Sequence, residues 1–324
     1  MVLKISCLIM AKPKPFHCPT NREEFEELKR NPRKLLQLLY KTRLLRVVDC
    51  KKCKQQCRIR ECNTDYDRAT YKMGYYQYCT VCYARYQLTK GSYFYGSALN
   101  WNQHLELLYC IYFDESIKNV VEKLGISKKI AIKYFKFYKR CFSKVVDEYY
   151  SNHELGDQHI VEIDESLTCK KYKHQRGHKG EEIWTLCMHE RGTMRYRFCE
   201  LGQKKTRKEI IPMIEKYVAK GTQIYTDQYS VYLILGSIGY KHYAINHQHR
   251  FACPFVIGAN TNGVEGAFGI SKAKFKEMKG CHRNYLQIYL DTFTFRKLYR
   301  GSEIGLFGEM LIAIGRMQDC VKLE

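Results

Sequence analysis

Three acidic residues lie where separate predicted elements begin or end. Asp164 closes a short apolar strand pattern, and Asp227 follows the strand pattern of residues 223–226. Glu265 begins a predicted helix, and Lys272 lies seven residues, or about two turns, further along the same helical face. Clustered carboxylates repel one another unless cations lie between them, and their hard oxygen atoms suit Mg²⁺ or Mn²⁺. The acidic residues therefore predict a divalent-metal site.

The elements that must position these acids form one run of strands and helices. Period-two patterns and helical patterns alternate in the order strand, strand, strand, helix, strand, helix, strand, and further helices follow. This order predicts a mixed sheet at whose edge the acids can converge. Because side chains alternate along a strand, Glu162 and Asp164 share one face and Glu165 points to the other. We expect Asp164 to be the ligand, with Glu165 at the surface or beside the ligands.

The cysteines predict a second metal site. Two C-x-x-C pairs are separated by 25 residues, and each can hold one side of a tetrahedral ion from a tight turn. The four thiols of these pairs are Cys50, Cys53, Cys79 and Cys82. Residues 73–78 form a predicted strand that delivers the second pair. The spacing predicts a zinc ribbon with a structural Zn²⁺. Two alternatives stay open. Cys57 or Cys62 could replace one of the four ligands, or the cysteines could be reduced thiols that bind no metal.

A helix-turn-helix is predicted before the sheet. Gly125 and Ser127 supply a glycine stop and an N-cap between two short amphipathic helices. The second helix carries basic side chains that suit phosphates and bases in a major groove. The predicted DNA-contacting residues are Lys128, Lys129, Lys133 and Lys136. A plain helical hairpin has the same pattern and remains an alternative.

Composition restricts the class of partner. The 324 residues include 55 Lys or Arg and 33 Asp or Glu, which gives a formal charge of +22. Such an excess favours a polyanionic partner, either nucleic acid or an acidic membrane surface. The 45% apolar and 14% aromatic content is enough for two or three packed domains, so general disorder is excluded.

The apolar segments of the sequence predict the cellular compartment of the protein. No run of about 18 apolar residues occurs, which excludes a membrane-spanning helix. The apolar run 2–10 is interrupted by Lys4 and lacks a cleavage site, so we do not expect secretion. We expect reduced thiols and a cytoplasmic protein, or a nuclear one if the host is eukaryotic.

Several motifs in order carry a family resemblance. They are Val161–Glu165 (VEIDE), Thr226–Tyr232 (TDQYSVY), Asn246-His247 and Asn260–Gly266 (NTNGVEG). Together they resemble those of the Merlin superfamily and related ISXO-type insertion-sequence transposases, from about residue 45 to about residue 300. Departures occur at Ala259, where the family often has His or Thr, and at Phe268, where it often has Trp.

The resemblance implies an α+β/α/β protein in which a zinc ribbon and a helix-turn-helix precede an RNase H-like mixed-sheet catalytic core. It assigns the acidic triad to Asp164, Asp227 and Glu265, with Lys272 as the following lysine. Two Mg²⁺ or Mn²⁺ ions about 3.5–4 Å apart would activate a water or a 3′-hydroxyl and stabilise the leaving oxygen. Asp164 would bridge the ions, and the other two acids would hold one ion each.

The implied function is a DDE-type DNA transposase. It would bind terminal repeats, cleave phosphodiester bonds and transfer 3′-hydroxyl ends to target DNA, as a homodimer or larger synaptic complex on double-stranded DNA. A domesticated DNA-binding protein without transposition activity is the alternative, and a nuclease without strand transfer is a third possibility. Taken singly, Asp227 would be a turn residue, Glu265 a solvated helix position and Lys272 part of a basic surface.

The patterns also predict the domain organisation. The expected parts are a helical segment at 1–45, the zinc ribbon at 46–95, the helix-turn-helix region at 100–150, the RNase H-like transposase domain at 155–302 and a C-terminal tail at 303–324.

Overall fold

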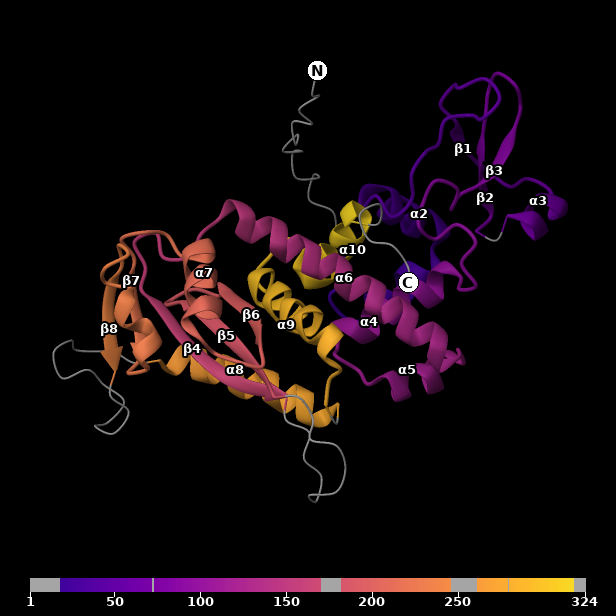
Figure 1. Cartoon of the computed structure of the whole chain (residues 1–324). Coiled ribbons are helices and arrows are strands. Elements are labelled where there is room, and N and C mark those ends of the chain that lie inside the picture. Colours follow the sequence, from indigo (N-terminus) through magenta and orange to yellow (C-terminus); the bar gives the residue numbers. More distant parts are fainter. Residues whose placement is uncertain (1–17, 72, 170–181, 246–260, 279, 318–324) are drawn as a thin grey trace. The chain divides into compact units, whose positions relative to one another are not determined.

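The chain forms two compact units, shown in the computed structural model of Figure 1. The structure describes residues 18–71, 73–169, 182–245, 261–278 and 280–317. Of these, residues 18–113 and 301–317 belong to the first unit and residues 114–300 to the second. No helix among the described residues is long and apolar enough to cross a membrane.

Two helices open the first unit. They are α1 (Arg22–Arg30) and α2 (Pro32–Lys41), and the side chains of Asn21 and Asn31 each accept a backbone N–H of the first turn. Pro32 is the first residue of α2, where a backbone N–H would have no helical partner. Proline therefore marks the point where α2 begins directly after α1.

The C-terminal segment corrects the predicted tail at 303–324. It contains α10 (Gly305–Met317), whose apolar side chains are buried in the first unit. The Phe307 ring packs edge-on against the Phe25 ring, with centroids 5.7 Å apart. A Cβ at Gly315 would lie 1.8 Å from the carbonyl oxygen of Thr42, so glycine permits this close approach. The tail prediction was wrong because the partners of α10 come from the other end of the chain.

The first unit also contains a small antiparallel sheet. Strands β1 (Arg58–Glu61), β2 (Tyr75–Tyr78) and β3 (Arg85–Gln87) pair in that order, and α3 (Asp65–Thr70) connects the first two. The strand predicted at 73–78 is confirmed as β2. A further helix of this unit, α4 (Trp101–Tyr112), begins with a capping box.

The second unit begins with the predicted pair of helices. Gly125 ends α5 (Ile117–Leu124) with φ 61°, and Ser127 caps α6 (Lys128–Asn152). However, α6 has 25 residues and is not short, because its apolar stripe continues and packs against α9 (Arg283–Leu298). The predicted region 100–150 is also divided, since α4 belongs to the first unit.

A five-stranded mixed sheet forms the centre of the second unit. Its strands are β4 (Val161–Cys169), β5 (Ile183–Glu190), β6 (Tyr196–Gly202), β7 (Gln223–Asp227) and β8 (Lys241–Ile245). The order across the sheet is β6-β5-β4-β7-β8. The first three strands along the chain pair antiparallel, whereas β7 lies parallel to both β4 and β8. The predicted succession of elements is confirmed, with α7 (Arg207–Tyr217) and the 3₁₀ helix η1 (Ser230–Ile234) as the connecting helices.

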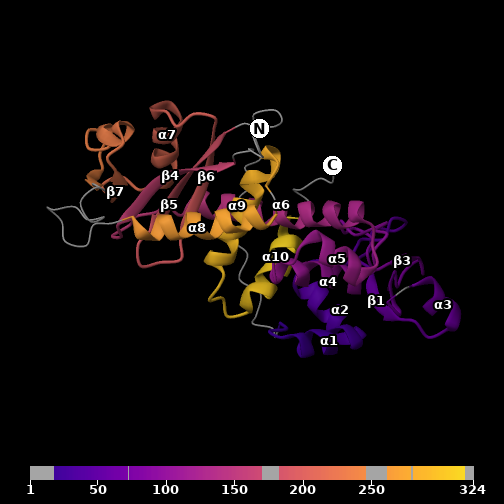
Figure 2. The ribbon, with the colours of Figure 1, turned by 90° about the horizontal axis from the view of Figure 1, so that it is seen from below.

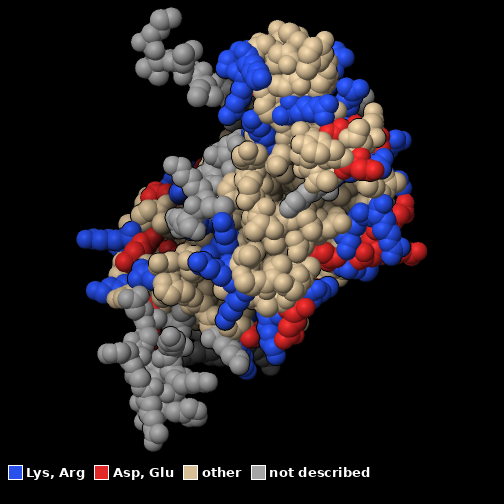
Figure 3. Space-filling view, turned by 90° about the vertical axis from the view of Figure 1, so that its right-hand side faces the viewer, with Lys and Arg blue, Asp and Glu red and all other residues tan. Residues whose placement is uncertain are grey.

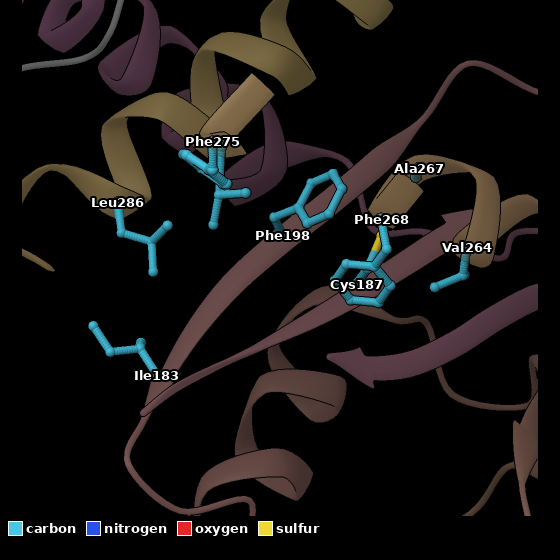
Figure 4. Packing of buried hydrophobic residues seen from close by; sticks show 9 residues of the cluster. Ile183, Cys187, Phe198, Val264, Ala267, Phe268, Phe275 and Leu286 are labelled. Carbon is cyan, nitrogen blue, oxygen red and sulfur yellow. The ribbon is translucent and has the colours of Figure 1, made fainter. Parts of the chain in front are cut away.

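Helix α8 (Asn262–Glu277) covers one part of this sheet. It contacts β4 and β5, and Figure 2 shows it running along them. Apolar side chains from β5, β6, α8 and α9 form a shared core (Figure 4). Its labelled members are Ile183, Cys187, Phe198, Val264, Ala267, Phe268, Phe275 and Leu286. This core fixes the helix that carries the third predicted acid.

A buried charge network joins α6, α9 and β6. The guanidinium of Arg197 donates to Oδ1 of Asp291 and to Oδ1 of Asp147, both at 2.9 Å. Asp291 is fully buried. We expect Asp291→Ala to lower the free energy of unfolding by about 3 kcal/mol, because it leaves a buried guanidinium without its main partner. Urea unfolding measures this, with Arg283→Ala, which breaks the more exposed pair with Glu200, as the control.

Candidate active site

Asp164 lies in the middle of β4, the central strand of the sheet. Its side chain is half-buried, and Oδ1 accepts the backbone N–H of Glu165 at 2.8 Å. Glu162, Asp164 and Ser166 alternate along one face of the strand, as the sequence predicts for the first two.

Asp227 is the last residue of the neighbouring strand β7. The register pairs Val161 with Ile224 and Glu162 with Tyr225, and its continuation by two residues sets Asp227 beside Asp164. Oδ1 of Asp227 accepts the backbone N–H of Tyr229 at 3.0 Å, which forms a turn at the strand end. The register therefore places the two predicted aspartates side by side on neighbouring strands and on the same face of the sheet.

Glu265 and Lys272 lie on α8. Glu265 is exposed in the first turn, and its Oε1 accepts the hydroxyl of Thr261 at 3.0 Å. Two turns further on, Nζ of Lys272 donates to Oγ of Ser166 on β4. The helix thus runs along the strand so that both residues lie over the face that carries Asp164.

The charges of the acids act on one another. Burial raises the pKa of the Asp164 carboxyl to about 7, and the negative charges of Glu165, Asp227 and Glu265 add to this rise. The structure therefore brings the predicted triad into electrostatic contact. Within the described part of the chain, the carboxylate oxygens of the triad do not form a set lying within 4.8 Å of one another. Hard oxygen donors that repel one another suit Mg²⁺ or Mn²⁺.

The raised pKa has a consequence for stability. The folded protein holds the Asp164 proton more tightly than the unfolded chain, whose carboxyl has the ordinary pKa of 3.8. Ionisation therefore costs the folded state stability as pH rises from about 4 to about 7. Without Mg²⁺ or Mn²⁺, we expect Asp164→Asn to stabilise the protein more at pH 8 than at pH 5. Urea midpoints at both pH values test this, and the exposed Asp157→Asn should show no such difference.

Glu165 does not take the first of its two expected positions, which was the surface. It is buried on the other face of β4, where Oε1 accepts from Nζ of Lys205 at 2.9 Å. Its Oε2 accepts the hydroxyl of Tyr232, a residue of η1. Both partners come from later elements that cover this face, so the second expectation, a position beside the ligands, is the one that remains.

Glu162 is a functional candidate that sequence reasoning placed on the correct face but did not single out. It is buried, and Oε1 accepts from Nε of Arg191 at 2.7 Å. Its Oε2 accepts the backbone N–H groups of Gly263 at 2.8 Å and Val264 at 3.2 Å. Burial opposes ionisation of this carboxyl, but its pKa is lowered by nearby His189, whose Nδ1 lies 3.7 Å from Oε2, and by the hydrogen bond from Arg191.

The four predicted zinc ligands come together in the first unit. The Sγ atoms of Cys50 and Cys82 lie 3.3 Å apart, as do those of Cys53 and Cys79. Sulfur atoms bound about 2.3 Å from a tetrahedral zinc would be about 3.8 Å from one another. The four sulfur atoms all lie within 4.8 Å of one another, so they could hold a metal ion.

The geometry separates these four thiols from the other cysteines of the segment. The hydroxyl of Tyr86 lies 3.3 Å from Sγ of Cys50, and this hydrogen bond lowers the pKa of Cys50 to about 5, with help from turn amides. Hydrogen bonds within the group act in both directions, because the pKa of Cys79 is also lowered whereas those of Cys53 and Cys82 are raised. Cys57 and Cys62 are buried and lie outside the group of four, so the arrangement of the sulfur atoms favours the outer four cysteines over a ligand exchange.

The predicted DNA-contacting lysines do not all have free side chains. Lys128, Lys129 and Lys133 are exposed on the first two turns of α6. Lys136 instead donates to the hydroxyl of Tyr285 at 2.6 Å and is half-buried. The first three therefore remain candidates for contact with a polyanion, whereas Lys136 is held by α9.

Comparison with known proteins relates the second unit to a transposase family. Residues 146–297 match the family model described as the ISXO2-like transposase domain. The mixed sheet with helices in this stretch agrees with a transposase catalytic core. The resemblance seen in the sequence is confirmed for this part. No curated protein matches the chain.

Solved structures of Mos1 transposase show a distant likeness. The pre-cleavage Mos1 transpososome is 12% identical with a TM-score of 0.22, and the mariner Mos1 paired end complex with Mg is 12% identical with a TM-score of 0.24. Each match covers 65% of this chain and 78% of the Mos1 chain. At such scores the chains do not superimpose as wholes, so no residue role is taken from them.

Part of the predicted motif set lies outside the described residues. This applies to Asn246-His247, Ala259 and Asn260.

Proposed function

We propose that the protein is a DDE-type DNA transposase that binds transposon ends, cleaves them and joins their 3′-hydroxyl groups to target DNA. The match of residues 146–297 to the ISXO2-like transposase domain carries this proposal. The acids of the predicted triad support it, because they come from β4, β7 and α8, and the charges of Asp227 and Glu265 help to raise the pKa of Asp164.

The roles of the site residues follow from their chemistry. Asp164, Asp227 and Glu265 would hold two Mg²⁺ or Mn²⁺ ions, which supply Lewis-acid activation of the attacking oxygen and stabilise the leaving oxygen. Lys272, held over β4 by Ser166, would offset the charge of a bound phosphate. The triad leaves no need for a covalent bond between protein and DNA.

The remaining parts would hold the DNA. The range 46–95 contains ten Lys or Arg and four Asp or Glu, and Figure 3 shows Lys and Arg side chains gathered at the top of the view, at the height of β1 and β3 in Figure 1. A structural Zn²⁺ on the four cysteines would stabilise this segment, and the start of α6 would contact phosphates or bases. Because two ends must be joined together, we propose a homodimer or larger synaptic complex, in the nucleus of a eukaryotic host or the cytoplasm of a bacterial one.

Strand joining tests this function. A labelled duplex carrying the terminal sequence that flanks the gene is incubated with plasmid DNA and Mg²⁺ or Mn²⁺. We expect the label to appear in plasmid, joined through its 3′ end. A duplex ending in a 2′,3′-dideoxynucleotide is the matched control and should not join.

The other two functions give different products. Cleavage of the duplex without joining would indicate a nuclease. Binding of the duplex without any reaction would indicate a domesticated DNA-binding protein. Either result would contradict the transposase proposal.

A further inference from the structure

We propose that Glu162 and Glu165 are positioning residues, which attach to β4 the start of α8, where Glu265 lies, and the segment that follows Asp227 at the end of β7. Asp164 lies between these two glutamates in the sequence. Strand β4 therefore supplies one acid of the triad and also the two side chains that hold the segments next to the other two acids. This inference rests on the proposed function, because it concerns the geometry of the same site.

The first anchor holds the start of α8. A helix leaves its first backbone N–H groups without helical partners, and usually the side chain of the N-cap residue accepts one of them. Thr261, at the N-cap of α8, makes no such hydrogen bond and donates to Glu265 instead. Oε2 of Glu162 accepts the N–H groups of Gly263 and Val264, from a position 101 residues earlier than Gly263.

The close approach of helix and strand depends on a glycine. A Cβ at position 263 would lie 2.2 Å from Nδ1 of His189 and 2.7 Å from Oε2 of Glu162. Because Glu265 follows Val264 directly, the contact that holds these first amides also sets the distance of Glu265 from β4. A negative carboxylate at the positive end of the helix dipole adds to the attraction.

The second anchor holds the segment after Asp227. Oε2 of Glu165 accepts the hydroxyl of Tyr232, which is fully buried in η1. The backbone N–H of Tyr229, just before η1, donates to Asp227. Oε1 of Glu165 also accepts from Lys205, whose carbonyl oxygen accepts the Tyr229 hydroxyl at 2.9 Å. Glu165 is thus connected through two routes to the turn that carries Asp227.

The two glutamates point to opposite faces of β4, and each holds the element that covers its own face. The strand therefore fixes α8 on one side and η1 on the other. Carboxylates that repel one another need such supports to remain close enough to share cations.

Mn²⁺ binding tests the inference without reference to catalysis. The full-length protein, with its zinc, is titrated with Mn²⁺ and followed by electron paramagnetic resonance, with Asp164→Asn to identify the ions bound at the site. We expect Glu162→Ala and Glu165→Ala each to weaken this binding by about 10-fold to 100-fold. Glu162→Gln retains an oxygen acceptor for the two helix amides, so it should bind Mn²⁺ more tightly than Glu162→Ala.

Glu190→Ala is the matched control. Glu190 is also buried and accepts from an arginine, since both its oxygens bind Nη1 of Arg195, but it holds neither α8 nor η1. We expect Glu190→Ala to lower the melting temperature but to leave the Mn²⁺ affinity within about threefold of the wild-type value. This limit is well below the loss of about 10-fold expected when a residue that supports a metal site is removed.

Backbone hydrogen exchange gives an independent measurement. In Glu162→Ala, exchange of the amides of Gly263 and Val264 should accelerate more than that of β5. Wild-type Mn²⁺ affinity in both alanine variants would overturn the inference and leave the proposed function intact. If the wild type showed no Asp164-dependent binding of Mn²⁺, the proposed metal site itself would be wrong, and the inference with it.

Discussion

Asp227→Asn is expected to lower the rate of strand joining by at least about 10³-fold, because metal ions stabilise the transition state by several kcal/mol. Asn keeps the size of the side chain and an oxygen that can accept the backbone N–H of Tyr229. It removes the negative charge that would hold a cation beside Asp164. Joining by the purified variant and the wild type at saturating DNA measures this loss.

The same variant should bind the end duplex as tightly as the wild type. Its side chain lies at the end of β7, whereas the exposed lysines belong to the start of a different element, α6. A gel-shift titration at fixed salt measures the affinity. The matched control is Asp157→Asn, an exposed aspartate just before β4, which should join at the wild-type rate. Normal joining by Asp227→Asn would remove Asp227 from the proposed triad.

The sequence predicted those parts of the fold that depend on local patterns. Strands β4, β5, β6, β7 and β8 follow from period-two alternation, and the turn between α5 and α6 follows from Gly125 and Ser127. The two C-x-x-C turns determine their own geometry, so the four-cysteine cluster was also predictable. These features need no knowledge of distant partners.

Features that depend on distant partners were not predictable in the same way. Alternation placed Glu165 on the face opposite Asp164, but only the later element η1 makes that position buried. Likewise, nothing near Glu162 in the sequence shows that its partners are amides of α8. The burial of α10 depends on helices at the other end of the chain.

The supports of the site were therefore harder to predict than the acids themselves. Asp227 and Glu265 are recognised by their motifs and by their places at a strand end and a helix start, and Asp164 is recognised by its motif within a strand; these are local properties. A support is recognised by its hydrogen-bond partners, which only the folded chain brings together.

Removal of a zinc ligand is expected to unfold the ribbon segment. Cys53→Ser takes one thiolate from the cluster in which Sγ of Cys53 lies 3.3 Å from Sγ of Cys79 and 3.7 Å from Sγ of Cys82. Binding of structural zinc by small modules contributes about 10–16 kcal/mol, which is more than the stability of most domains. Three short strands of three or four residues have little core of their own to replace it.

Two measurements check this expectation. Elemental analysis should find one zinc per wild-type chain and much less in Cys53→Ser, and hydrogen exchange across residues 46–90 should accelerate in the variant. The matched control is Cys62→Ser, because Cys62 is a buried cysteine of the same segment outside the group of four. It should retain its zinc. Loss of zinc in Cys62→Ser together with full zinc in Cys53→Ser would show that the ligands differ from those the cluster indicates.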